Sequence, residues 1–205
     1  MVVEKQLISK ISWRLMPFLG ILYLIAYIDR QNVSFAKLQM VDALGMSEYA
    51  YGLGASLFFI GYFIFEVPSN LFLEKFGASR WFARILVSWG LVTIALAFTQ
   101  SAGMFYVLRF LLGVCEAGFF PGVLYLMTLW YPARYRGAMV GLFMIFSAVA
   151  NAIGAPLGGS LLAMDGLLGL KGWEWVFLVT GVPAVIAGIV TWFYLDDRPE
   201  KAIPP

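Results

Sequence analysis

Histidine is absent from this 205-residue sequence, and cysteine occurs once, as Cys115. A single thiol cannot form a disulfide within the chain. Without histidine, the sequence also lacks a common ligand of zinc and haem and the base of Ser-His and Cys-His catalytic pairs. Any proton transfer must therefore use carboxylates. We expect no metal, no cofactor apart from a coupled proton, and no enzymatic activity.

Charged residues are also scarce: they make up 13% of the chain, and the net charge is only +2. Such a small and dispersed positive charge gives no indication of nucleic-acid binding. Hydrophobic residues make up 61% of the chain and aromatic residues 17%, and the mean hydropathy is +0.84. A water-soluble domain of this size does not have this composition. The sequence therefore predicts an all-α integral membrane protein in a lipid bilayer.

The apolar runs predict a bundle of six transmembrane helices over residues 14–195. A mixed, charged segment, residues 1–13, precedes the bundle and is expected in the cytoplasm. A polar, proline-rich segment, residues 196–205, follows it and is typical of a linker. Pro121 and Pro156 lie inside the fourth and fifth spans and are expected to bend them. The six expected spans cover residues 14–36, 49–73, 82–100, 104–129, 137–163 and 174–195.

Lysine and arginine indicate the orientation of this bundle. If the N-terminus is cytoplasmic, ten of the 14 cations fall in inner segments, two in outer loops and two within the spans. This bias follows the positive-inside rule and predicts a protein of the cell (inner or plasma) membrane. The inner cations are Lys5, Lys10, Arg14, Lys75, Arg80, Arg84, Arg134, Arg136, Arg198 and Lys201.

Two charged residues, Arg109 and Glu116, stand within the fourth span. They are seven residues apart, almost two helical turns, so both project from the same face. The first span carries Asp29 and Arg30, whose side chains diverge by about 100°, so only one of them is expected to face a cavity squarely. A charge at the bilayer centre costs about 2.5–3.5 kcal/mol and often marks a transport path. A buried ion pair that only holds helices together is the alternative.

Uncharged polar residues extend this candidate site. The phenols of Tyr27 and Tyr62 are candidates for binding a substrate hydroxyl or carboxylate. Ser147 and Asn151, one turn apart in the fifth span, are candidates for hydrogen bonding to a substrate. The alternatives are aromatic packing for the tyrosines and bonds to a neighbouring helix for the other two. Glu66 lies nearer the inner end of the second span, where we expect an inner gate rather than a substrate contact.

Five short motifs carry a family resemblance. They are Tyr27-Ile28-Asp29-Arg30-Gln31-Asn32-Val33-Ser34-Phe35-Ala36; Gly61-Tyr62-Phe63-Ile64-Phe65-Glu66-Val67-Pro68-Ser69-Asn70-Leu71; Arg109 to Gly113 with Glu116 to Gly122; Trp130-Tyr131-Pro132-Ala133-Arg134; and Asp197-Arg198-Pro199-Glu200-Lys201-Ala202. In combination they resemble the major facilitator superfamily, specifically the anion:cation symporter branch with its permeases for tartrate, phthalate and 4-hydroxyphenylacetate. The resemblance covers essentially the whole chain.

The resemblance implies that this chain is the N-terminal half of a twelve-helix transporter. The C-terminal six-helix half would be its structural partner and supply the other side of the binding site. Drug antiporters of the superfamily carry Gly-Pro-x-x-Gly-Gly in the fifth helix, whereas this chain has an inserted alanine and a shorter spacer over residues 154–159, which weakens an efflux function. The resemblance also implies a cytoplasmic gate latched by the loop that carries Asn70, Glu74, Lys75, Gly77 and Arg80, with Asn70 in place of the family's first glycine. We expect Glu66, Arg134 and Arg136 in the same gate.

Together these features predict a secondary active transporter that imports a small organic anion with a proton. In the empty site Arg30 or Arg109 would pair with Glu116 or Asp29, and a substrate carboxylate would take over the guanidinium. Glu116 is the favoured proton-coupling acid, and the resemblance implies Asp29 as a second titrating group. A hydroxy-dicarboxylate, a sugar acid or an aromatic acid would suit such a site. The alternatives are a uniporter or exchanger without proton coupling, and a membrane scaffold that does not transport.

Overall fold

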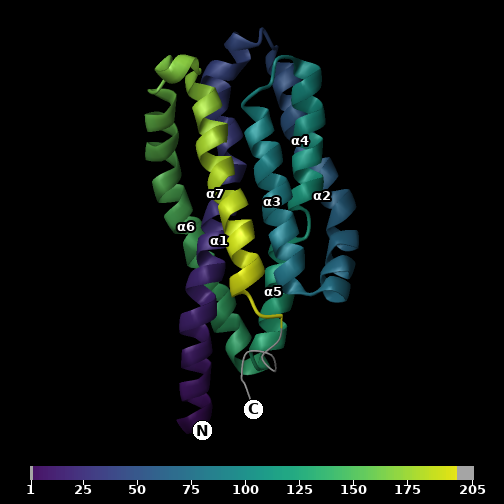
Figure 1. Ribbon diagram of the computed structural model, residues 1–205, viewed down its shortest axis with the longest axis vertical. Helices are drawn as coiled ribbons and strands as arrows, with labels where there is room; N and C mark the ends of the chain where they lie inside the picture. The colour runs from purple at the N-terminus through teal and green to yellow at the C-terminus, as the bar shows by residue number, and fades with distance from the viewer. Residues whose placement is uncertain (1, 198–205) are drawn as a thin grey trace.

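Eight helices make up the described part of the chain, residues 2–197 of the computed structural model (Figure 1). No strand occurs within these residues. The predicted linker, residues 196–205, lies outside the described residues from residue 198 onward. The helices are α1 (Val2–Ala43), α2 (Glu48–Phe76), α3 (Ala78–Leu96), α4 (Ala102–Glu116), α5 (Phe119–Trp130), α6 (Ala133–Leu162), the short 3-10 helix η1 (Leu167–Gly169) and α7 (Gly172–Tyr194).

Six helical spans are long and apolar enough to cross a membrane, as the apolar runs predicted. α1, α2, α3, α6 and α7 each provide one span, and α4 and α5 together provide the fourth, Ala102–Trp130. Some helices extend further than expected. α1 begins at Val2, so most of the predicted segment 1–13 continues the first span as a helix. The chain is therefore an integral membrane protein built only from helices in its described part.

The fourth span is broken between α4 and α5, at Ala117 and Gly118. Gly118 has a φ of 86°, in the left-handed region that glycine adopts without the steric cost of a Cβ. Pro121 was expected to bend the span, but it lies in the first turn of α5, where a missing backbone N–H is tolerated. The chain therefore breaks just before the proline. Pro156, in contrast, lies inside the helical range of α6.

The helices pack in pairs: α3 along α7, α2 along α4, and α1 against both α6 and α7. Two glycines permit the approach of α2 to α4. A Cβ on Gly113 of α4 would lie 2.0 Å from the carbonyl oxygen of Phe58. A Cβ on Gly61 of α2 would lie 2.5 Å from the carbonyl oxygen of Phe110. Small residues thus bring the two backbones together at the level of the candidate site, which is their usual role between membrane helices.

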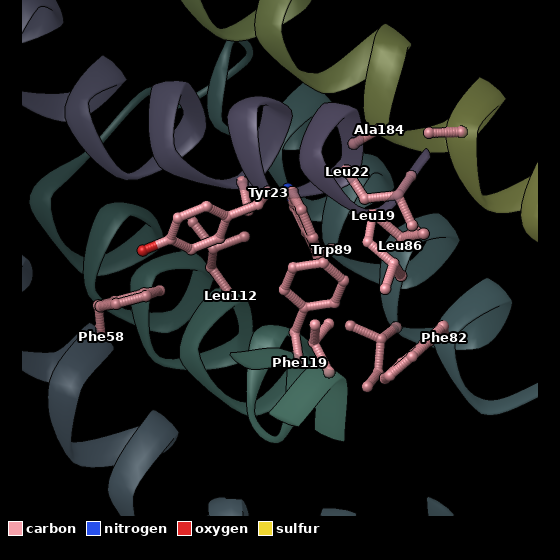
Figure 2. Packing of buried hydrophobic residues seen from close by; sticks show 14 of the residues in the cluster. Leu19, Leu22, Tyr23, Phe58, Phe82, Leu86, Trp89, Leu112, Phe119 and Ala184 are labelled. Carbon is pink, nitrogen blue, oxygen red and sulfur yellow. The ribbon is translucent and has the colours of Figure 1, made fainter. Parts of the chain in front are cut away.

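An aromatic cluster fills the core behind the break in the fourth span (Figure 2). Phe119, the first residue of α5, lies near Phe82 and Trp89 of α3. The ring centroid of Phe119 is 5.6 Å from that of Phe82 and 5.8 Å from that of Trp89, and both contacts are edge-on. All three side chains are completely buried. Edge-to-face aromatic contacts at this spacing are favourable, so the cluster anchors the start of α5 against α3.

The start of α1 and the end of α7 lie at the same end of the bundle, named here the terminal end (Figure 1). The turn at Gly77 between α2 and α3 and the connection from α5 to α6 at residues 131–132 lie there as well. Arg14 of α1 donates from Nη2 to Asp196 Oδ2 at 3.2 Å, and the Tyr194 hydroxyl donates to the Arg14 carbonyl oxygen at 3.3 Å. These contacts join the first and last helices at the terminal end.

Candidate functional site

An ion pair between α1 and α4 forms the centre of the candidate site. Arg30 Nε donates to Glu116 Oε1 at 2.5 Å. Glu116, the last residue of α4, is completely buried, while Arg30 keeps 35% of its side chain exposed. The guanidinium carbon of Arg30 also lies 5.1 Å from the ring centroid of Tyr62 on α2, close enough for cation–π attraction. Of the pairings that the sequence left open, the one between Arg30 and Glu116 is present.

The pair leaves part of its hydrogen-bonding capacity unused. Glu116 Oε2 is buried and has no hydrogen-bond partner among the described residues. A carboxylate accepts at both oxygens, and a buried oxygen without a donor is unfavourable. Glu116 can therefore gain a donor or a proton without first breaking its bond to Arg30.

Arg109 is the second cation of the site, and within residues 2–197 it forms no ion pair. It is buried, and its Nε has no hydrogen-bond partner there. Its guanidinium carbon lies 4.8 Å from the ring centroid of Phe58 on α2. A buried guanidinium that is not bonded to a carboxylate is costly, and its planar fork matches a carboxylate. The arrangement is therefore suited chemically to receiving an anion.

Asp29 is hydrogen-bonded to its own helix and to α3. Its Oδ1 accepts from Asn32 Nδ2 at 3.0 Å, and its Oδ2 accepts from the Thr93 hydroxyl at 3.2 Å. Asn32 Nδ2 also donates to the Thr180 hydroxyl of α7 at 3.0 Å. Asp29 is completely buried. Of the two adjacent charges, only Arg30 forms an ion pair with Glu116, while Asp29 connects α1 to α3, and Asn32 extends this network to α7. A proton-coupling role for Asp29 stays a prediction.

Tyr27 and Asn151 meet where α1 contacts α6. Asn151 Oδ1 accepts from Gln31 Nε2 at 2.6 Å, and its Nδ2 lies 3.4 Å from the Tyr27 hydroxyl, to which it donates. Asn151 is nevertheless exposed. Ser147 donates its hydroxyl to the carbonyl of Met144 on its own helix at 2.7 Å. Asn151 thus makes the interhelical bonds that were one of its two predicted roles, and a substrate contact stays a prediction for all three site residues.

The turn between α2 and α3 carries the first of the expected gate residues. Gly77 has a φ of 90°, and a Cβ there would lie 2.7 Å from the carboxylate oxygens of Asp197. The backbone N–H of Ser79 donates to Asp197 Oδ1 at 2.8 Å. A carboxylate at the N-terminus of α3 satisfies a free N–H and complements the helix dipole. Asp197 thereby connects the end of the last helix to this turn, and Arg80 beside it is exposed.

Four further expected gate residues lie along the last turns of α2. Asn70 donates from Nδ2 to the Glu66 carbonyl oxygen at 2.8 Å, within the same helix. Glu66 is half-buried, and Glu74 and Lys75 are exposed. The Lys75 ammonium nitrogen lies 5.7 Å from the ring centroid of Phe76. The structure thus gathers these residues at the terminal end, and their gating role stays a prediction.

Arg134 and Arg136, also expected in the gate, lie in the first turn of α6. Arg134 forms an ion pair with Glu4 of α1. Arg136 donates to the carbonyl oxygens of Tyr131 at 2.9 Å and Thr128 at 3.0 Å. These carbonyls belong to the end of α5, where the last backbone acceptors of a helix lack partners of their own. The two arginines therefore connect α6 to α1 and α5 at the terminal end.

Several residues that shape the site were not among the predicted ones. Thr93 and Thr180 belong to the Asp29 network, and Phe58 lies beneath Arg109. Gln31 was not a predicted site residue, yet it donates a hydrogen bond to Asn151. The two threonines had a signal in the sequence, because polar side chains inside apolar spans need partners. Phe58 had none, since one phenylalanine among 18 is not distinguished by its sequence position.

The chain belongs to the major facilitator superfamily, because the model of that family matches residues 19–205. It is 56% identical over 198 residues to a quinolone resistance transporter of Acinetobacter baumannii, which covers 97% of this chain and 46% of that protein. It is 52% identical to the metabolite transport protein NicT of Pseudomonas putida and 50% identical to a protein of Agrobacterium vitis named as a tartrate transporter. These alignments cover 97% and 98% of this chain, and 46% and 44% of the respective relatives.

A solved structure has the same fold. The crystal structure of a bacterial homologue of the human lysosomal transporter Spinster, in an inward-facing and occupied conformation, superposes with a TM-score of 0.82 at 18% identity. The match covers 90% of this chain and 44% of that one. The chain thus spans about half the length of the curated relatives it matches, consistent with the predicted N-terminal half. These findings confirm that the chain belongs to a family of membrane transporters, which implies a small-molecule substrate and a lipid bilayer.

Proposed function

We propose that this chain forms half of a proton-coupled symporter that imports a small organic anion across the cell membrane. The observation that carries the proposal is that only one of the two cations forms an ion pair: Arg30 is bound to Glu116, while Arg109 is buried and its Nε has no hydrogen-bond partner among the described residues. An anion that binds Arg109 gives this cation a direct ion-pair partner. An anion that reaches Arg30 competes with Glu116. Both events favour binding of a carboxylate over binding of a neutral solute.

Coupling to a proton follows from the burial of Glu116. Glu116 is completely buried. When a substrate carboxylate displaces it from Arg30, the Glu116 carboxylate loses its ion-pair partner. A buried carboxylate without a partner takes up a proton readily. Asp29 and Glu116 balance Arg30 and Arg109, so an added anion and an added proton together leave the net charge of these groups at zero. The loaded site then carries no extra charge between inward and outward states.

The names of the relatives narrow the substrate class without agreeing on one compound. One relative is named as a tartrate transporter and another as a quinolone resistance transporter. Tartrate is a hydroxy-dicarboxylate, the class for which paired guanidinium groups and the Tyr62 phenol are suitable. We therefore take tartrate as the first probe. The positive-inside distribution of lysine and arginine supports an orientation with the terminal end, and with it the N-terminus, in the cytoplasm.

The test is tartrate uptake by vesicles that contain the complete transporter, with its second six-helix half, with and without an inward proton gradient. We expect accumulation only with the gradient. Glu116→Gln should abolish accumulation and retain exchange of tartrate across the membrane, while Arg30→Lys should abolish both. Glu48→Gln is the matched control. Glu48 is an exposed acid at the start of α2, the opposite end of this helix from the expected gate, and it pairs with Lys37 of α1.

Three results would contradict the proposal. If tartrate only equilibrates whatever the gradient, and Glu116→Gln behaves as the unchanged protein, the chain belongs to a uniporter or exchanger. If vesicles that are preloaded with a quinolone lose it in exchange for protons and take up no tartrate or other acid, the direction and the substrate are both wrong. If neither compound moves and neither alters thermal stability, the protein is a membrane scaffold.

A further inference from the structure

The break in the fourth span leaves a buried carbonyl without its helical donor. In an unbroken α-helix the N–H of residue 121 would donate to the carbonyl of residue 117. Residue 121 is proline, which has no N–H and whose ring collides with that carbonyl. Ala117 is completely buried, so water does not replace the missing donor. A buried carbonyl of this kind needs another partner.

Ser69 of α2 is that partner. Its hydroxyl donates to the Ala117 carbonyl oxygen at 2.6 Å. The same hydroxyl accepts from the indole N–H of Trp81, in the first turn of α3, at 3.0 Å. A serine hydroxyl has only one proton to donate, and the indole N–H is only a donor, so the direction of both bonds is fixed. Trp81 thus orients the Ser69 hydroxyl towards the break.

The approach of Ser69 also requires the glycine at the break. A Cβ on Gly118 would lie 2.4 Å from Ser69 Oγ and 2.6 Å from Ser69 Cβ. The left-handed φ of Gly118 would strain any other residue there. On the far side of the break, Phe119 is held by Phe82 and Trp89 (Figure 2). The break is therefore held from α2 by one hydrogen bond and from α3 by aromatic packing.

We infer that Ser69, oriented by Trp81, is a positioning residue for Glu116, a role that rests on the proposed function. Glu116 directly precedes Ala117, so the bond that holds the Ala117 carbonyl also sets where α4 ends and where the Glu116 side chain leaves it. If the break closed into a continuous helix, the end of α4 would rotate and shift relative to α1, and Glu116 would leave Arg30. Because Trp81 follows the turn at Gly77, this contact also joins the expected gate to the coupling carboxylate.

The test compares five forms of the complete transporter: unchanged, Ser69→Ala, Pro121→Ala, the double variant, and Ser56→Ala. Ser56 is the matched control, since its hydroxyl donates to a carbonyl of its own helix, α2, and is exposed. The two measurements are hydrogen–deuterium exchange of residues 117–122 and the initial rate of gradient-driven tartrate uptake. Pro121→Ala restores the N–H that an unbroken helix would use to bind the Ala117 carbonyl. It therefore separates the two roles of Ser69, which are to satisfy this carbonyl and to position Glu116.

We expect Ser69→Ala to raise exchange of this segment about tenfold and to lower uptake about tenfold, because the Ala117 carbonyl loses its donor. In the double variant the new N–H of residue 121 satisfies that carbonyl, so exchange should return to the original rate while uptake stays low. Ser56→Ala should change neither measurement. Unchanged exchange in Ser69→Ala would overturn the inference. Recovery of uptake together with exchange in the double variant would also overturn it, because Ser69 would then only satisfy a carbonyl.

The inference is tested separately if the unchanged protein takes up no tartrate and the proposed function fails. Arg30→Gln and Glu116→Gln are then made singly and together, and thermal stability is measured. In the unchanged background the two effects should not add, since the residues form a pair. In the Ser69→Ala/Pro121→Ala background they should add, because the pair is broken. Persistent non-additivity there would show that Ser69 does not position Glu116.

Discussion

Replacing Gly113 by alanine should force α2 away from α4. The new Cβ would lie 2.0 Å from the Phe58 carbonyl oxygen and 2.9 Å from the backbone nitrogen of Tyr62, whereas ordinary contact begins at 3.4 Å. The helices must therefore separate by about 1.4 Å, the difference between 3.4 and 2.0 Å, because both obstructing atoms belong to the backbone. Overpacking of this kind costs about 3 kcal/mol, and the better helix propensity of alanine offsets about 1 kcal/mol. We expect a net loss of about 2 kcal/mol.

The assay is thermal unfolding of the complete transporter in detergent, with Gly103→Ala as the control. Gly103 lies on the same helix, and a Cβ there would meet no atom within 4 Å. Gly113→Ala should melt clearly below the unchanged protein, and Gly103→Ala at or slightly above it. Since Phe58 and Tyr62 lie against the two guanidinium groups, Gly113→Ala should also lower tartrate uptake. If Gly113→Ala and Gly103→Ala have the same melting temperature, the backbone contact between α2 and α4 does not limit the distance between these helices.

Two further predictions concern stability. Thr93→Val removes the hydroxyl that donates to Asp29 while keeping the side-chain shape, so we expect the free energy of unfolding to fall by about 1.5–3 kcal/mol. Thr128 is exposed, so Thr128→Val should leave the stability unchanged. Equal melting temperatures of the two variants would refute this prediction. Arg14→Gln should change stability by less than about 1 kcal/mol, because its ion pair with Asp196 is largely exposed, and a large loss on melting would show that this pair is better shielded than its exposure indicates.

The sequence predicted the number of spans and the presence of charges within them, because both depend on one dominant cost. Polar groups are unfavourable in hydrocarbon, so long apolar runs and rare internal charges are recognisable without a structure. The broken fourth span was missed in part. Pro121 indicated a disturbance of the helix, but the position of the break depends on Ser69 supplying a donor from another helix. A long-range hydrogen bond of this kind leaves no local pattern.

The pairing of the charges shows the same division. Helical geometry alone separated Asp29 from Arg30 and placed Arg109 and Glu116 on one face of their span. Which cation would meet Glu116 stayed open, because that choice depends on the lateral distance between α1 and α4 and on the glycine contact that sets α2 against α4. The packing of Arg109 on Phe58 could not be predicted from the sequence either, since many phenylalanines lie along the spans.

By itself, the sequence determined that this protein is a six-span helical membrane protein with charged residues buried in its first and fourth spans and a bias of cations to one side. These are properties of single segments, and the bilayer enforces them one helix at a time. Only the tertiary structure decided that Arg30 pairs with Glu116, that Arg109 Nε has no hydrogen-bond partner among the described residues, and that Ser69 and Trp81 hold the break beside the carboxylate. These contacts join residues far apart in the chain, and packing between helices selects them from several chemically equivalent pairings.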